Sequence, residues 1–123
     1  MKKITIAFDV DWTLIKTWFN KDNIDTFDFF EDVNRNIANL LISLSYFKNV
    51  KIIVWSGQWE EWARQITKLS SLDDRVDWYA SKNHKGKNEN WKHIFEPDIV
   101  PDIAIDDIQA CELWLINLIV KEK

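Results

Sequence analysis

Two aspartates separated by one residue stand in the segment 9–13 (DVDWT), directly after the apolar run 3–8 (KITIAF). Asp9 and Asp11 should therefore project into one crevice, at the point where the chain leaves a sheet. Two carboxylates this close repel each other, so that one pKa would rise. A hard divalent cation removes the conflict, because Mg²⁺ prefers oxygen ligands and commonly shares its site with phosphate. The segment thus predicts a site for magnesium and phosphate.

Further polar residues capable of chemistry end three other apolar runs. Run 50–55 precedes Ser56-Gly57, run 76–80 precedes Ser81-Lys82, and run 102–105 precedes Asp106-Asp107. The Ser56 hydroxyl and the backbone N–H groups that follow it, beginning at Gly57, can hold an anion at the start of a helix. The ammonium group of Lys82 can pair with phosphoryl oxygens. Asp106 and Asp107 can supply the remaining carboxylate ligands.

The identity of the lysine is open on the sequence alone. Lys82, Lys85 and Lys87 all lie near the end of the third run, and Lys82 is preferred because it follows that run most closely. The stretch 82–93 holds four lysines and one acid in an otherwise acidic chain. It is interpreted either as a solvated loop or as a basic rim that recruits a phosphorylated substrate.

The elements that must position these residues follow from the hydrophobic pattern. The apolar runs are typical of strands in a parallel sheet covered on both faces. Spacings of three and four predict helices over 27–48 and 58–69, with Trp59 and Trp62 in the core, and a shorter helix over 88–95. The tail 108–120 is interpreted as a short helix followed by a strand around 116–120, with a single helix as the alternative.

This alternation predicts an α/β fold, a Rossmann-like three-layer arrangement with a parallel central sheet and helices on both faces. No linker or shift of composition divides the chain, so residues 1–123 are expected to form a single domain. Ligands of such sheets bind beyond the carboxyl ends of the strands. All the polar residues singled out above fall there.

Composition narrows the classes of partner. Sixteen basic against 20 acidic side chains give a net charge of −4, which does not indicate a nucleic-acid binder. A lone cysteine, Cys111, cannot form an internal disulfide. There is no signal-peptide pattern and no apolar window long enough to span a membrane. We therefore expect a cytoplasmic protein with no membrane partner; oligomerisation is left open.

The residues and their order resemble those of the haloacid dehalogenase-like (HAD) superfamily of phosphohydrolases. The family's first motif, an apolar strand ending in D-x-D-x-T, is matched by FDVDWTL, and its second, ending in Ser or Thr, by KIIVWSG. Its third motif is a lysine, and its fourth, a strand ending in an acidic pair, is matched by DIAIDD. The resemblance covers about the whole chain and implies a magnesium-dependent phosphatase that hydrolyses a phosphomonoester.

The resemblance also implies residue roles. Asp9 attacks phosphorus to form an aspartyl-phosphate. Asp11 protonates the leaving oxygen and later takes a proton from the hydrolytic water. Mg²⁺ is held by Asp9, the backbone carbonyl of Asp11 and Asp107, with Asp106 a second ligand or an orienting neighbour.

The phosphate-binding residues implied by the resemblance are Thr13, Ser56, Gly57 and Lys82. Ser56 and Lys82 neutralise the transferring group, and Thr13 is expected to hydrogen-bond locally and hold the loop that carries Asp11.

Two departures from the family pattern bear on the substrate. Trp12 stands where the family often has glycine, so the loop should be stiffer and the indole should wall the pocket. About a dozen residues separate Thr13 from the first predicted helix, which leaves no room for a cap domain. The exposed-looking pair Trp18-Phe19 falls where the family has a short flap, where it can stack on a substrate. An open crevice of this kind suits a phosphorylated small molecule or macromolecule.

Three rival readings remain. A phosphotransferase or nucleotidase would differ only in its substrate. A catalytically silent HAD-like module would bind a phosphorylated partner, but it would not need the second carboxylate, Asp11. A receiver domain also uses an aspartyl-phosphate, an acidic pair and a lysine, but in an order along the sheet that this chain does not match.

Overall fold

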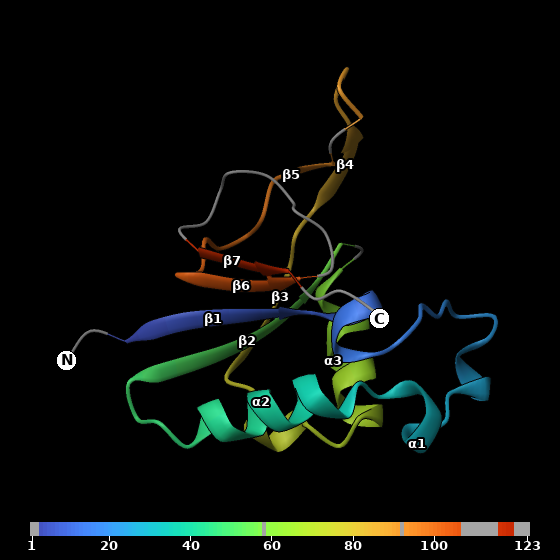
Figure 1. The fold of residues 1–123 in the computed structure, drawn as a ribbon. Coiled ribbons are helices and arrows are strands. Elements are labelled where there is room, and N and C mark those ends of the chain that lie inside the picture. The colour runs from blue at the N-terminus through green and yellow to red at the C-terminus, as the bar shows by residue number, and fades with distance from the viewer. Residues whose placement is uncertain (1–2, 58, 92, 107–115, 120–123) are drawn as a thin grey trace.

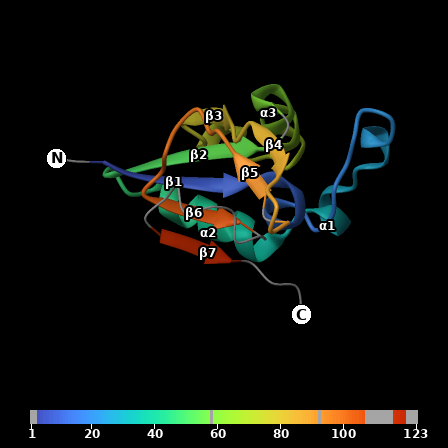
Figure 2. The ribbon, with the colours of Figure 1, turned by 90° about the horizontal axis from the view of Figure 1, so that it is seen from above.

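Five parallel strands form the central sheet of the computed structural model, which describes residues 3–57, 59–91, 93–106 and 116–119. The strands stand in the order β3-β2-β1-β6-β7, and each neighbouring pair is parallel (Figures 1 and 2). Their bounds are β1 Ile4–Asp9, β2 Val50–Ser56, β3 Trp78–Ser81, β6 Ile103–Asp106 and β7 Ile116–Ile119. The predicted α/β class with a parallel sheet is confirmed.

The four apolar runs named from the sequence all form strands of this sheet. The last strand is confirmed as well: 116–119 is β7 and pairs with β6, so the alternative of a single helix through the tail is wrong for these residues. The short helix expected before it, and Cys111, fall within 107–115, outside the described residues.

The two longer helices, α2 (Arg35–Ser45) and α3 (Glu60–Leu69), pack on the same face of the sheet (Figure 1). Phe8 and Val54 from the strands meet Leu41 of α2 and Ile66 of α3 in one buried cluster. Apolar side chains at alternating positions of the same strands, including Ala7 and Trp55, face the opposite side. There the cover is Phe95 and Ile99, and no helix described by the structure lies on that side.

The helix expected over 27–48 is broken, and the prediction is wrong at its centre. Asp28 caps a single turn, α1 (Phe29–Asp32), and Asn34 caps α2 by accepting a hydrogen bond from the Ile37 N–H at 3.5 Å. Val33 between them forms an isolated antiparallel bridge with Ile15. This long-range pairing interrupts the helical hydrogen bonds.

The helix expected over 88–95 is also wrong, because this stretch belongs to a β-hairpin. Strands β4 (His84–Lys87) and β5 (His93–Phe95) pair antiparallel. The Asn88 side chain accepts a hydrogen bond from the Asn90 N–H at 2.8 Å, and its carbonyl accepts one from Trp91 at 3.0 Å. Asparagine favours such turns over a helix because its side chain competes for backbone groups. The hairpin rises from the carboxyl end of the sheet, away from α2 and α3 (Figure 1).

Short turns complete the described chain: η1 (Val10–Leu14), η2 (Ile24–Thr26) and η3 (Asp73–Arg75). The segment 16–28 projects beyond the carboxyl ends of the strands (Figure 2). None of the helices in the described ranges has both the length and the apolar character needed to cross a bilayer.

Candidate functional site

The acidic ends of β1 and β6 lie side by side. These strands pair in parallel register, with Phe8 opposite Ile105, which brings the next residues, Asp9 and Asp106, to the same edge of the sheet. Both residues are buried, with only 5% and 3% of their surfaces exposed. Two buried carboxylates need compensating charge or ligands, since an unpaired charge in the interior is costly.

Lys82 supplies that charge. Its backbone N–H donates to the Ser56 carbonyl at 2.8 Å, which fixes it just beyond β3. Its ammonium lies 2.7 Å from Asp9 Oδ1 and 3.0 Å from Asp106 Oδ2, and the residue is 3% exposed. Burial alone would lower the pKa of Lys82, but the carboxylates of Asp9 and Asp106 outweigh it and raise that pKa above its ordinary value. Lys82 is therefore a cation at neutral pH.

Lys85 and Lys87, the other two candidates for this role, lie on β4 and are exposed. Among the lysines in the described ranges, Lys82 is the one that forms an ion pair with Asp9 and Asp106. Of the three candidates, Lys82 is thus the one at the carboxylate cluster, and its role toward phosphate stays a prediction.

Asp11 lies in the turn that follows β1. The backbone at Asp11 (φ −68°, ψ 132°) and Trp12 (φ 64°) is not helical, although both residues fall inside η1. Asp11 Oδ1 is buried and has no hydrogen-bond partner among the described residues, and the same holds for the nearby Trp62 Nε1. Burial raises the pKa of Asp11 from 3.8 to about 6, against opposing effects of the Trp62 indole and the Lys82 ammonium.

Thr13 and Ser56 line the same end of the sheet. Thr13 is fully buried and its hydroxyl donates to Asp9 Oδ2 at 3.3 Å, which is the local hydrogen bond expected of it, because the bond spans the turn that carries Asp11. Ser56 is 1% exposed, and its hydroxyl donates to the Trp59 carbonyl at 3.4 Å, one residue before α3 begins. Gly57 follows Ser56 at the point where the chain turns toward α3.

The predicted magnesium ligands are only partly described. Asp9 and Asp106 are brought together, and Asp11 is close enough for the Lys82 ammonium to lower its pKa, whereas Asp107 lies outside the described residues. Within the described ranges, no group of three His, Cys, Asp or Glu side chains could hold a metal ion. Carboxylate and carbonyl oxygens of Asp9, Asp11 and Asp106 nevertheless fit the donor chemistry of Mg²⁺, and Asp11 Oδ1 is an acceptor left unpaired.

Tryptophans around this site are placed differently from the sequence prediction. Trp62 is buried as expected, but Trp59, expected in the core, is 54% exposed, because it precedes α3 and is not on its buried face. Trp18 is 51% exposed, as expected, and Trp12, expected to wall the pocket, is 42% exposed. Phe19 is instead 5% exposed and packs edge-on against Phe27, so the prediction that it is available to a substrate is wrong.

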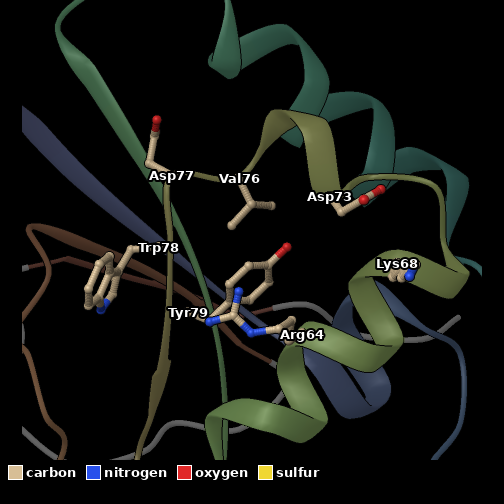
Figure 3. Close-up of a pocket in the computed structure, with 7 residues that line it drawn as sticks. All are labelled: Arg64, Lys68, Asp73, Val76, Asp77, Trp78 and Tyr79. Atoms are coloured by element: carbon tan, nitrogen blue, oxygen red, sulfur yellow. The ribbon is translucent and has the colours of Figure 1, made fainter.

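A separate groove of about 490 Å³ lies at the outer edge of β3 (Figure 3). Tyr79 of the strand points toward α3, whereas Trp78 points to the other side of the strand, and the Arg64 guanidinium lies 4.5 Å from the centroid of the Tyr79 ring. Burial, followed by the charge of Asp73, raises the pKa of Tyr79. None of the residues predicted to do chemistry lines this groove.

Comparison of the chain with protein-family models, with curated proteins and with solved structures finds no match. The likeness to the HAD superfamily therefore stays a prediction from the four motifs. What the chain can do must be argued from the cluster at the carboxyl ends of β1 and β6.

Proposed function

We propose that this chain is a magnesium-dependent phosphatase that hydrolyses a phosphomonoester in the cytoplasm through an aspartyl-phosphate. In this proposal residues 1–123 form one HAD-like domain without a cap, with a Rossmann-like three-layer arrangement. The observation that carries the proposal is the buried cluster of Asp9, Lys82 and Asp106, with Asp11 beside it. Charges this deeply buried at the end of a parallel sheet are typical of a functional site.

Asp9 is the proposed nucleophile. Its Oδ1 is ion-paired with Lys82 and its Oδ2 accepts a hydrogen bond from Thr13, so the carboxylate is ionised and held in one orientation. In the first step a carboxylate oxygen forms a bond to phosphorus while the bond from phosphorus to the leaving oxygen breaks. This step divides one difficult displacement into two easier ones.

Asp11 is the proposed acid and base. A carboxyl whose pKa is about 6 is protonated in a useful fraction of molecules near neutral pH, so it can give its proton to the leaving oxygen. In the second step it takes a proton from the water that attacks phosphorus. The bond between phosphorus and Asp9 then breaks, and the Asp9 carboxylate and inorganic phosphate are released.

The remaining residues bind charge. The Lys82 ammonium and the N–H groups after Ser56 can neutralise oxygens of the transferring phosphoryl group. Asp9, the backbone carbonyl of Asp11 and Asp106 would hold Mg²⁺ together with Asp107. When bound, the cation would offset the charge of the carboxylates and of the phosphoryl group.

The test is hydrolysis of a small aryl phosphate, with and without Mg²⁺, by the wild-type chain and by Asp9→Asn. We expect phosphate release that EDTA abolishes, and a loss of at least about 1,000-fold in kcat for Asp9→Asn, since the amide is a poor nucleophile. Asp25→Asn, in an exposed turn, is the matched control and should retain wild-type activity.

Two results would overturn the proposal. If Asp9→Asn keeps near-wild-type turnover, Asp9 is not the nucleophile. If the wild type binds phosphorylated compounds without releasing phosphate from the aryl ester or from a panel of phosphomonoesters, the silent binding module is the better account.

A further inference from the structure

The β4–β5 hairpin is joined to the proposed site at its base. The His84 N–H donates to the Gly57 carbonyl at 3.3 Å, and a Cβ on Gly57 would lie 3.8 Å from the His84 Cβ. Phe95, at the end of β5, is buried, and its ring centroid lies 4.9 Å from the Lys82 ammonium. A substrate whose phosphate binds at Asp9 would therefore lie next to this hairpin, on the face of the sheet opposite to α2 and α3.

The exposed part of the hairpin is basic and aromatic. Lys85 and Lys87 are exposed on β4, and Trp91, in the turn, is 79% exposed. The Lys87 ammonium lies 5.9 Å from the centroid of the Trp91 ring. Glu89 is the one acid in 84–91. The hairpin is thus locally positive, although the net charge of the whole chain is negative.

The backbone of Trp91 points to a role for its ring. Its φ of 61° lies in the left-handed region, which is unfavourable for a bulky side chain. Trp12, beside Asp11, has the same strained conformation (φ 64°) and is 42% exposed. In neither case does full burial of the indole offset the strain. Strained backbone is common at ligand-binding sites, so the exposed indole rings are candidates to contact a ligand.

The other projection from this end of the sheet has the opposite charge. The segment 16–28 holds three acids and two lysines, and two more acids, Glu31 and Asp32, follow it in α1. An extended polyanion leaving the site would be repelled along this segment and attracted along the hairpin. Figures 1 and 2 show the two projections leaving the carboxyl end of the sheet in different directions.

We propose that the β4–β5 hairpin binds single-stranded nucleic acid, so that the substrate phosphate is the terminal phosphate of such a strand. Lysines neutralise successive backbone phosphates, and an exposed indole stacks on a base regardless of sequence. A phosphorylated peptide would use the lysines but would gain little from the flat face of Trp91. This inference rests on the proposed function for the reaction itself, but the binding surface can be tested without turnover.

The experiment measures binding of an unphosphorylated, fluorescently labelled oligothymidylate to the full chain by anisotropy, at several salt concentrations. We expect saturable binding with a Kd below about 100 μM at low salt. Trp91→Ala should weaken binding about tenfold through lost stacking. Lys85→Gln/Lys87→Gln should weaken binding and reduce the slope of log K against log salt by about 1.4, whereas Lys85→Arg/Lys87→Arg should retain wild-type binding.

Lys51 and Trp78 provide a matched control, because the Lys51 ammonium also lies 5.9 Å from the Trp78 ring centroid. Trp78 is 56% exposed and stands at the outer edge of the sheet. Trp78→Ala and Lys51→Gln should leave oligothymidylate affinity within about twofold of wild type, since neither residue is on the hairpin.

Several outcomes would overturn the inference: no saturable binding by the wild type, equal losses in the hairpin and control variants, or tighter binding of a phosphopeptide of equal charge. Equal affinity for duplex DNA, with no effect of Trp91→Ala, would overturn the stacking role. A chain that hydrolyses the aryl phosphate but does not bind the oligonucleotide refutes this inference alone. A chain that binds the oligonucleotide but has no Asp9-dependent turnover refutes the proposed function alone.

Discussion

At the scale of the residue, the main feature of the site is the balance of buried charges. Asp9, Lys82 and Asp106 together carry one net negative charge in a place almost closed to water. The Lys82 ammonium compensates the charge of both carboxylates. Without it, the buried carboxylates would be left as uncompensated charges, which is strongly destabilising. Asp11 Oδ1 has no hydrogen-bond partner within bonding distance among the described residues, and burial raises the pKa of Asp11 to about 6 despite the opposing effects of the Trp62 indole and the Lys82 ammonium.

Asp11 therefore predicts how the stability of the metal-free protein depends on pH. Its pKa is raised in the folded state, from 3.8 to about 6, so the folded state holds this proton more tightly than the unfolded chain does. The resulting stabilisation is complete below pH 3.8 and is lost as the pH rises through about 6. Asp11→Asn, which cannot ionise, should be more stable than wild type at about pH 7.5, by up to about 3 kcal/mol.

The measurement is urea unfolding in EDTA at several pH values. The advantage of Asp11→Asn should shrink toward about pH 4, where the wild-type carboxyl is protonated. Asp25→Asn controls for the loss of one negative charge on the surface. An advantage for Asp11→Asn that is constant across this range would show that Asp11 is not buried as described.

At the scale of the element, the turn after β1 determines where Asp11 and Trp12 go. The Ile15 N–H donates to the Val10 carbonyl at 3.1 Å, and the Trp12 N–H donates to the Thr17 carbonyl at 3.2 Å, so the turn is closed on itself. Closing it in this way requires the left-handed backbone at Trp12. The position suits glycine better than any side chain with a Cβ.

This geometry predicts an unusual order of stability for two variants. Both Trp12→Gly and Trp12→Ala lose the indole, but only alanine keeps the penalty of a Cβ at φ 64°. Trp12→Gly should therefore be more stable than Trp12→Ala by about 1 kcal/mol in chemical denaturation.

Trp18 supplies the comparison, because it is exposed and is not among the described residues with positive φ. There the order should reverse, with glycine less stable than alanine, since glycine loses more conformational freedom on folding. The same order at both positions would contradict the described turn.

Sequence periodicity predicted the elements that carry the site better than those that surround it. The ends of β1, β2, β3 and β6 follow from apolar runs that stop at polar residues, and the pairing of β1 with β6 brings Asp9 and Asp106 together as expected. The break at Val33 depends on a bridge to Ile15, which is 18 residues away and leaves no local signal. The sequence did not predict the hairpin, because the short stretch 88–95, with two asparagines and one tryptophan, has no clear hydrophobic period.

At the scale of the whole molecule, the described structure places the residues of the proposed chemistry at one end of the sheet. The segment 16–28 and the β4–β5 hairpin project from this end, one mainly acidic toward its tip and the other basic (Figure 2). This arrangement would meet two requirements of the enzyme without a cap that we propose. The reacting groups are buried within the fold itself, and the part of a large substrate that does not react can bind to the surface of the protein.

The central claim is that Asp9 becomes phosphorylated, and the most direct measurement is to find the phosphoryl group on it. Asp11→Asn should be mixed with nitrophenyl phosphate and Mg²⁺ and quenched in acid, because nitrophenolate leaves without a proton while the second step still lacks its base. Borohydride reduction, which converts aspartyl-phosphate to homoserine, followed by peptide mass spectrometry, should place homoserine at position 9. Hydrolysis without modification of Asp9, or a phosphoryl group on another residue, would contradict the account.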